Sequence, residues 1–99
     1  MEINGLLMDL KDNVVTCVTE VPKGSEVIYR KGNEICALTA EESIPYCHKI
    51  ALVDFEAEEE VIKYGELIGK TSRPVKRGQW VSHENIYSVP RDYDSELIR

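Results

Sequence analysis

Hydrophobic and polar residues alternate along most of the chain with the two-residue period of β-strands, and helical periodicity is scarce. The segment 14–19 is rich in β-branched residues, and the apolar segments 26–29 and 34–38 flank a Gly32-Asn33 turn that predicts a hairpin. Residues 39–43 are compatible with one helical turn before a proline. Further short strands are expected at 48–53, 61–65, 67–71 and 79–83.

A weak internal repeat accompanies this pattern. It consists of an apolar residue, two variable residues, a turn residue, two variable residues and valine. Gly24 and Gly78 occupy the turn position in two copies, where glycine accepts a positive φ at little cost, and Glu58 occupies it in the third. Turn-then-strand sequences are common in β proteins, but three copies in one short chain favour a compact fold of folded-over strands. The copies are 21–27, 55–61 and 75–81.

The length and charge of the chain exclude several classes of function. The chain has 99 residues, 42% of them hydrophobic and 30% charged, which fits one globular domain. The formal net charge of −6 argues against nucleic-acid binding and against a membrane surface held by basic residues. No apolar segment approaches the roughly 20 residues that span a bilayer, and the N-terminus does not resemble a signal peptide. A cytoplasmic domain is expected.

The cysteines support the same expectation. Cys17, Cys36 and Cys47 are odd in number and include no C-x-x-C pair, so neither a disulfide scaffold nor a zinc site is indicated. We expect ordinary buried thiols in a reducing compartment.

Two groups of residues are candidates for chemistry. His48, His83 and Glu84 have the donor types that bind iron, manganese or zinc, although two distant histidines are a weak signal and structural or surface roles remain open. Lys63 and Tyr64 place a cation and a phenol beside a glycine, which suits an acidic small molecule. The alternative for this pair is a solvated lysine on an exposed strand edge.

Several blocks, in uninterrupted order from residue 11 to residue 88, together resemble one family. They include a Lys-Asp-Asn-Val block at 11–14 and a Val-x-x-Gly-x-x-Val block at 75–81. The specific ones are His48-Lys49-Ile50-Ala51-Leu52 and Ile62-Lys63-Tyr64-Gly65-Glu66-x-Ile68-Gly69. They are similar to the small SAF-type N-terminal domain of the altronate/galactarate dehydratases, a family that also includes the small subunit of (2R)-sulfolactate sulfo-lyase.

The resemblance implies a mainly β, SAF-type β-clip fold of short folded-over strands with little helix. The β-clip domain is expected over 1–90, followed by a tail or short helix at 91–99. In this family the small domain works beside a larger domain or subunit that holds most of the catalytic machinery, often with a divalent metal such as iron or manganese. The reaction is a β-elimination, which removes water from altronate or galactarate, or sulfite from sulfolactate. Such a reaction needs a base and electrostatic stabilisation of the developing enolate.

By match, the resemblance gives this chain a site that borders a small hydroxy-acid substrate. It assigns catalytic roles to His48 and Lys63 and substrate-binding roles to Lys49, Tyr64, Gly65 and Asn85. The family typically has Val-His-x-His-Asn where this chain has Val-Ser-His-Glu-Asn, so Ser82 and Glu84 replace the two family histidines and a histidine stands between them. His83 and Glu84 are the candidate metal ligands that this departure leaves, and whether this end has a metal or acid–base role is open.

Three functions follow as alternatives. The first is the small subunit of a sugar-acid or sulfolactate lyase, inactive without its larger catalytic subunit. The second is a non-catalytic β-clip module for binding or docking. The third is a lone metal-binding protein that uses His48, His83 and Glu84.

Overall fold

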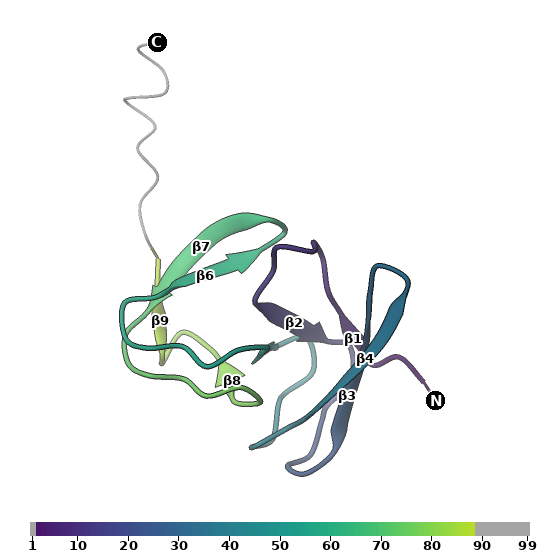
Figure 1. Cartoon of the computed structure of the whole chain (residues 1–99). Coiled ribbons are helices and arrows are strands. Elements are labelled where there is room, and N and C mark those ends of the chain that lie inside the picture. Colours follow the sequence, from purple (N-terminus) through teal and green to yellow (C-terminus); the bar gives the residue numbers. More distant parts are fainter. Residues whose placement is uncertain (1, 89–99) are drawn as a thin grey trace.

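The computed structural model describes residues 2–88, which form short antiparallel strands and no helix (Figure 1). This confirms the expected mainly β, β-clip class, while the tail expected at 91–99 lies outside the described residues. Because these residues contain no helix, they contain none long and apolar enough to cross a membrane. The strands are β1 Gly5–Leu6, β2 Val14–Cys17, β3 Glu26–Lys31, β4 Glu34–Thr39, β5 Lys49–Ala51, β6 Glu60–Lys63, β7 Glu66–Thr71, β8 Trp80–Val81 and β9 Ile86–Tyr87.

Two hairpins flank a central sheet. The central sheet has the strand order β1-β2-β5-β8, the β3–β4 hairpin forms a second sheet, and β6-β7-β9 form a third. Figure 1 shows the β3–β4 and β6–β7 hairpins on opposite sides of the central strands. Each side of the central sheet therefore has its own hairpin to pack against.

The core consists of two clusters, one on each side of the central sheet. Successive side chains of a strand point to opposite faces. In β2, Val14 accordingly packs into one cluster and Val15 into the other. The first cluster contains Val15, Cys17, Val21, Val27, Tyr29, Leu38, Ala40, Ile44 and Ile50, and the second contains Val14, Ala51, Phe55, Val61, Val75 and Val81.

The repeated seven-residue spacing corresponds to a left-handed turn residue between two buried apolar residues. Gly24, Glu58 and Gly78 have φ angles of 88°, 67° and 91°. Sequence reasoning missed a fourth copy, 44–50, because Cys47 occupies its turn with φ 64° and isoleucine replaces the final valine. In every copy the turn residue donates its backbone N–H to another segment. The accepting carbonyls belong to Ala40 for Gly24, Cys17 for Cys47, Thr71 for Glu58 and Ala51 for Gly78.

Two asparagines fasten the hairpins to the central sheet in the same way. Each asparagine side chain accepts a bond from one backbone N–H of a hairpin strand and donates to the carbonyl two residues earlier. The backbone carbonyl of each asparagine also accepts a hydrogen bond from the N–H of the residue that follows β2 or β5. Asn4 bonds Ile28 and Glu26 of β3, and Asn13 bonds Ile62 and Glu60 of β6.

The helical turn considered for residues 39–43 is absent, because the backbone there bonds to other segments. Ala40 donates its N–H to the Ser25 carbonyl, and Glu41 donates to the Gly78 carbonyl. Strands β1 and β9 were not predicted, since each is only two residues long and carries no alternation that a sequence pattern reveals.

Two glycine substitutions separate backbone strain from close packing. A Cβ at Gly24 meets no atom within 4 Å, so Gly24→Ala should lower the free energy of unfolding by only about 1 kcal/mol, the cost of the left-handed conformation. A Cβ at Gly78 lies 2.6 Å from the Thr39 carbonyl oxygen. Gly78→Ala should therefore cost about 2–4 kcal/mol. Urea denaturation of both variants checks this, and equal costs would contradict the close approach at Gly78.

Candidate functional site

The turn between β6 and β7 is built around a buried carboxylate. Tyr64 and Gly65 both have positive φ, 58° and 71°, as a two-residue type I′ hairpin turn requires. The Asp12 carboxylate, whose residue is only 7% exposed, accepts the backbone N–H groups of Tyr64 at 3.1 Å and Gly65 at 2.8 Å. A Cβ at Gly65 would lie 3.0 Å from the Asp9 carboxylate. Gly65, predicted to bind substrate, therefore has a structural use in shaping this turn.

The turn presents a lysine and a phenol together. Lys63 is the last residue of β6 and is half-buried, and its Nζ lies 5.1 Å from the centroid of the Tyr64 ring. The Tyr64 side chain is 61% exposed. An ammonium over an aromatic face is an attractive cation–π arrangement that restrains the long lysine side chain.

Lys49 brings a second positive charge to Lys63. It is the first residue of β5 and is half-buried, and strand β2 of its sheet lies against β6. Burial first, and the nearby Lys63 charge second, lower the pKa of Lys49 below its ordinary value of 10.5. Among residues 2–88 no carboxylate contributes an opposing shift. The structure therefore brings two predicted site residues near each other in a chain of net charge −6, with Glu66 as the cross-strand partner of Lys63.

Thr16 belongs to the same place, and sequence reasoning missed it. It is the cross-strand partner of Lys49, and its Oγ1 is buried without a hydrogen-bond partner. The neighbouring Cys17 N–H bonds to the His48 carbonyl at 2.8 Å, so Thr16 and Lys49 form a non-hydrogen-bonded pair, in which side chains are closest. A threonine in a β-branched strand looks ordinary in sequence, so no signal pointed to it.

His48 lies apart from the lysines. Its Nδ1 accepts a bond from Trp80 Nε1 at 3.1 Å, and the two rings meet edge-on with centroids 5.3 Å apart. Trp80 packs against the first core cluster, whereas Val81, the cross-strand partner of Lys49, belongs to the second. His48 and Lys63, the two predicted catalytic residues, are thus directed to opposite sides of the central sheet. The bond to Trp80 leaves Nε2 of the exposed ring as the proton-bearing nitrogen of neutral His48.

Asn85 supports His48 indirectly. It is 7% exposed, its Oδ1 accepts the Ser82 N–H at 2.9 Å, and its Nδ2 donates to the Trp80 carbonyl at 2.7 Å. Both the oxygen and the nitrogen of the side-chain amide bond to backbone groups. This predicted substrate-binding residue therefore fixes the strand that carries Trp80.

His83 and Glu84 are exposed neighbours on the turn before β9. Within residues 2–88 no three or more His, Cys, Asp or Glu side chains are placed to hold a metal ion. Two adjacent side chains on an exposed turn do not by themselves fit a metal site, so no chemical step is derived through a metal in this chain.

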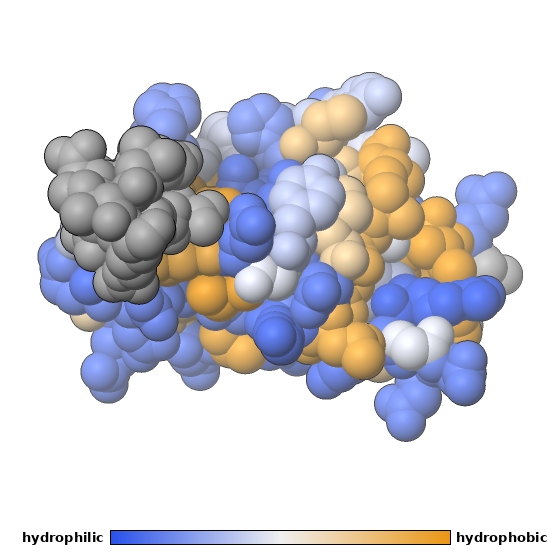
Figure 2. All heavy atoms as spheres, turned by 90° about the horizontal axis from the view of Figure 1, so that it is seen from above, coloured by the Kyte–Doolittle hydropathy of each residue, from blue (hydrophilic) through white to orange (hydrophobic). Residues whose placement is uncertain are grey.

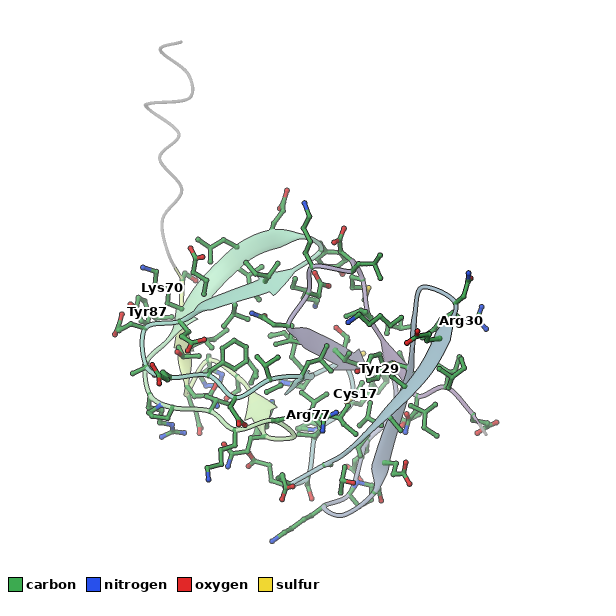
Figure 3. The ribbon with its side chains drawn as sticks, viewed as in Figure 1. Cys17, Tyr29, Arg30, Lys70, Arg77 and Tyr87 are labelled. Atoms are coloured by element: carbon green, nitrogen blue, oxygen red, sulfur yellow. The ribbon has the colours of Figure 1, made fainter. Side chains whose placement is uncertain are left out.

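The cysteines depart from the expected pattern. Burial raises the pKa of the Cys17 thiol to about 11, which keeps it protonated and unreactive. Figure 3 shows Cys17 in the interior near Tyr29, and Arg77 near the same tyrosine. Cys36 is only half-buried and Cys47 is exposed, so the expectation of buried thiols holds for Cys17 and is wrong for Cys47.

The fold and these residues define a known class of domain. The altronate/galactarate dehydratase SAF domain matches residues 3–89, and the chain therefore belongs to that family. Galactarate dehydratase (L-threo-forming) of Escherichia coli (strain K12) is 35% identical over 77 residues, which cover 78% of this chain. The match covers 12% of that enzyme, so the chain corresponds to a small part of its relative.

The Asp12 carboxylate is open to a direct test. Asp12→Ala leaves the N–H groups of Tyr64 and Gly65 without acceptors and should lower the free energy of unfolding by about 2–4 kcal/mol. As a control, Asp54→Ala removes one bond to the exposed Arg77 N–H and should cost about 1 kcal/mol or less. Thermal denaturation measures both changes. An equal loss in the two variants would contradict a special role for Asp12.

Lys49 predicts a pH-dependent difference in stability. Because its pKa is lowered in the fold, charged Lys49 destabilises the folded chain at neutral pH, and this cost disappears as pH rises from the lowered pKa through 10.5. Lys49→Met should therefore be more stable than the parent chain at pH 7, and the difference should shrink by pH 10.5. Urea denaturation across this range gives the difference, and a gap that widens with pH would contradict the burial of a charged Lys49.

Proposed function

We propose that this chain is the small subunit of a lyase that acts on a hydroxylated carboxylic acid. The substrate would be a sugar acid such as altronate or galactarate, or sulfolactate. The observation that carries the proposal is the pair of neighbouring lysines Lys49 and Lys63 in an otherwise acidic chain, at a place where two family blocks meet. Membership of the dehydratase SAF family and the similarity to galactarate dehydratase support it.

Elimination gives each residue a task. Removal of the proton α to a carboxylate develops negative charge on that carboxylate, and cationic donors nearby lower the energy of the transition state. Lys63 and Lys49 would hold the carboxylate and stabilise this charge, with the exposed Tyr64 phenol beside them. The exposed His48 ring, supported by Trp80, would take part in a proton transfer on the opposite side of the central sheet from the lysines.

A larger catalytic subunit is required by this proposal, because His48 and Tyr64 are exposed and Lys49 and Lys63 are only half-buried. Ligand sites usually bury most of their ligand, and this chain alone covers only part of one. Leu10 is exposed in the loop between Asp9 and Asp12 that contacts the Tyr64–Gly65 turn. On the face seen from above, hydrophobic patches alternate with hydrophilic ones (Figure 2), which suits contact with a partner. Most of the catalytic groups, and a divalent metal such as iron or manganese that would act as a Lewis acid, are proposed to lie in that subunit.

The separation of His48 from Lys63 favours a second candidate function. In that case the chain is a non-catalytic β-clip module that docks on a larger protein or binds a sugar acid without turnover. Its complexes would then show no elimination activity.

Reconstitution distinguishes the two. A tagged chain is used to isolate its larger partner from source-cell extract, and the complex is assayed with galactarate, altronate and sulfolactate. Lys63→Ala and His48→Ala should each lower turnover at least about tenfold, the loss of one modest transition-state contact. Lys23→Ala, a change at an exposed turn, is the matched control and should leave turnover unchanged. Unchanged rates in both site variants would refute the assignment, and a complex without activity would favour the docking module.

A further inference from the structure

We propose that Thr16, Lys49 and Lys63 together form a carboxylate-binding subsite within this chain, with the Thr16 hydroxyl as its specificity-determining donor. The inference rests on the proposed function, because it identifies which group of a hydroxy-acid substrate this chain holds. It goes further in assigning the binding to three residues from three strands and in predicting that the chain binds the acid without a partner.

The register of the strands places these residues together. Thr16 on β2 and Lys49 on β5 are opposite each other as a non-hydrogen-bonded pair, where the two side chains are closest. Lys63 ends β6, which packs against β2, and it lies near enough to Lys49 for the two positive charges to repel. Thr16 and Lys49 therefore lie on the face of the central sheet that carries the second core cluster, and β6, which ends at Lys63, packs against β2 of that sheet.

The unpaired hydroxyl of Thr16 is a hydrogen-bond donor that the described residues do not use. Thr16 Oγ1 is the buried side-chain polar atom without a hydrogen-bond partner among the described residues. A buried hydroxyl normally finds a partner, because leaving it unpaired is costly. A second buried threonine, Thr71, shows the usual outcome: its hydroxyl accepts from the Glu59 N–H and donates to the Glu56 carbonyl.

The donor set selects a carboxylate. Two ammonium groups and one hydroxyl can all donate hydrogen bonds, and no carboxylate of residues 2–88 offsets the charge on Lys49. A ligand carboxylate supplies one negative charge and two acceptor oxygens, whereas a neutral polyol supplies no charge. The Thr16 hydroxyl is buried between the cross-strand neighbours Lys49 and Leu6, so a ligand reaches it by displacing one of these side chains, of which the lysine is the longer and more flexible.

A threonine-to-valine substitution separates this role from a structural one. Thr16→Val keeps the shape of the side chain and removes the unpaired hydroxyl, so the melting temperature should rise by about 4 °C. The same change should weaken carboxylate binding by about tenfold, the loss of one hydrogen bond to a charged group. Thr71→Val is the matched control: it removes a hydroxyl with two partners, so it should lower the melting temperature and leave binding unchanged.

The test is a proton–nitrogen NMR titration of the full chain, without any partner, using galactarate. Saturable shifts at the amides of Thr16, Lys49 and Lys63 are expected, with about tenfold weaker binding in Lys49→Gln and in Thr16→Val. Galactitol, the neutral polyol, should give no shift at these amides. Sulfate should bind more weakly than galactarate.

Each contrary outcome is decisive. Absence of galactarate binding, equal binding of sulfate or galactitol, or full affinity in Thr16→Val would overturn the subsite. The turnover assay of the reconstituted complex tests the proposed function separately. Binding that depends on Thr16 in a chain whose complexes have no activity would preserve the subsite and refute the lyase role. Turnover that is unaffected by Thr16→Val would preserve the lyase role and refute the subsite.

Discussion

The fold depends on one backbone device that occurs four times: a left-handed turn residue whose N–H bonds to a different segment. At Gly24, Cys47, Glu58 and Gly78 the chain reverses between two buried apolar residues, and the turn's free donor is satisfied by a carbonyl elsewhere. Short strands of two to six residues cannot hold a sheet by their own ladders. Because each turn is fastened to another segment, the strands stay in register despite their length.

The same kind of fastening reaches the candidate site. Asn13 bonds the backbone of β6 through its side chain, and the neighbouring Asp12 holds the next turn through Tyr64 and Gly65. These bonds hold the backbone on both sides of Lys63, at the turn end of its hairpin. The Lys-Asp-Asn-Val block that contributes to the family resemblance is therefore structural, and it acts on the site through backbone geometry.

Sequence reasoning predicted what local pattern encodes. The hairpin at Gly32, three of the four repeats and the strands around Ile50 and Val61 follow from alternation and turn chemistry. The fourth repeat was missed because it has neither a glycine at the turn nor the final valine, and Cys47 and Ile50 stand at these positions. Thr16 was missed for another reason: its importance comes from strand pairing with Lys49, and such a long-range register is invisible in a linear pattern.

The arrangement of the predicted catalytic residues constrains any mechanism. Adjacent residues at the start of β5 point in opposite directions, so His48 lies with Trp80 on one side of the central sheet while Lys49 lies with Lys63 on the other. A small acid held at the lysines can therefore meet the His48 ring only around the edge of the sheet. If both groups act on one substrate, the partner must bring a second surface around the edge of the sheet. If they do not, the lysines bind substrate and His48 contacts the partner, so the two halves of the family block His48-Lys49 have separate tasks.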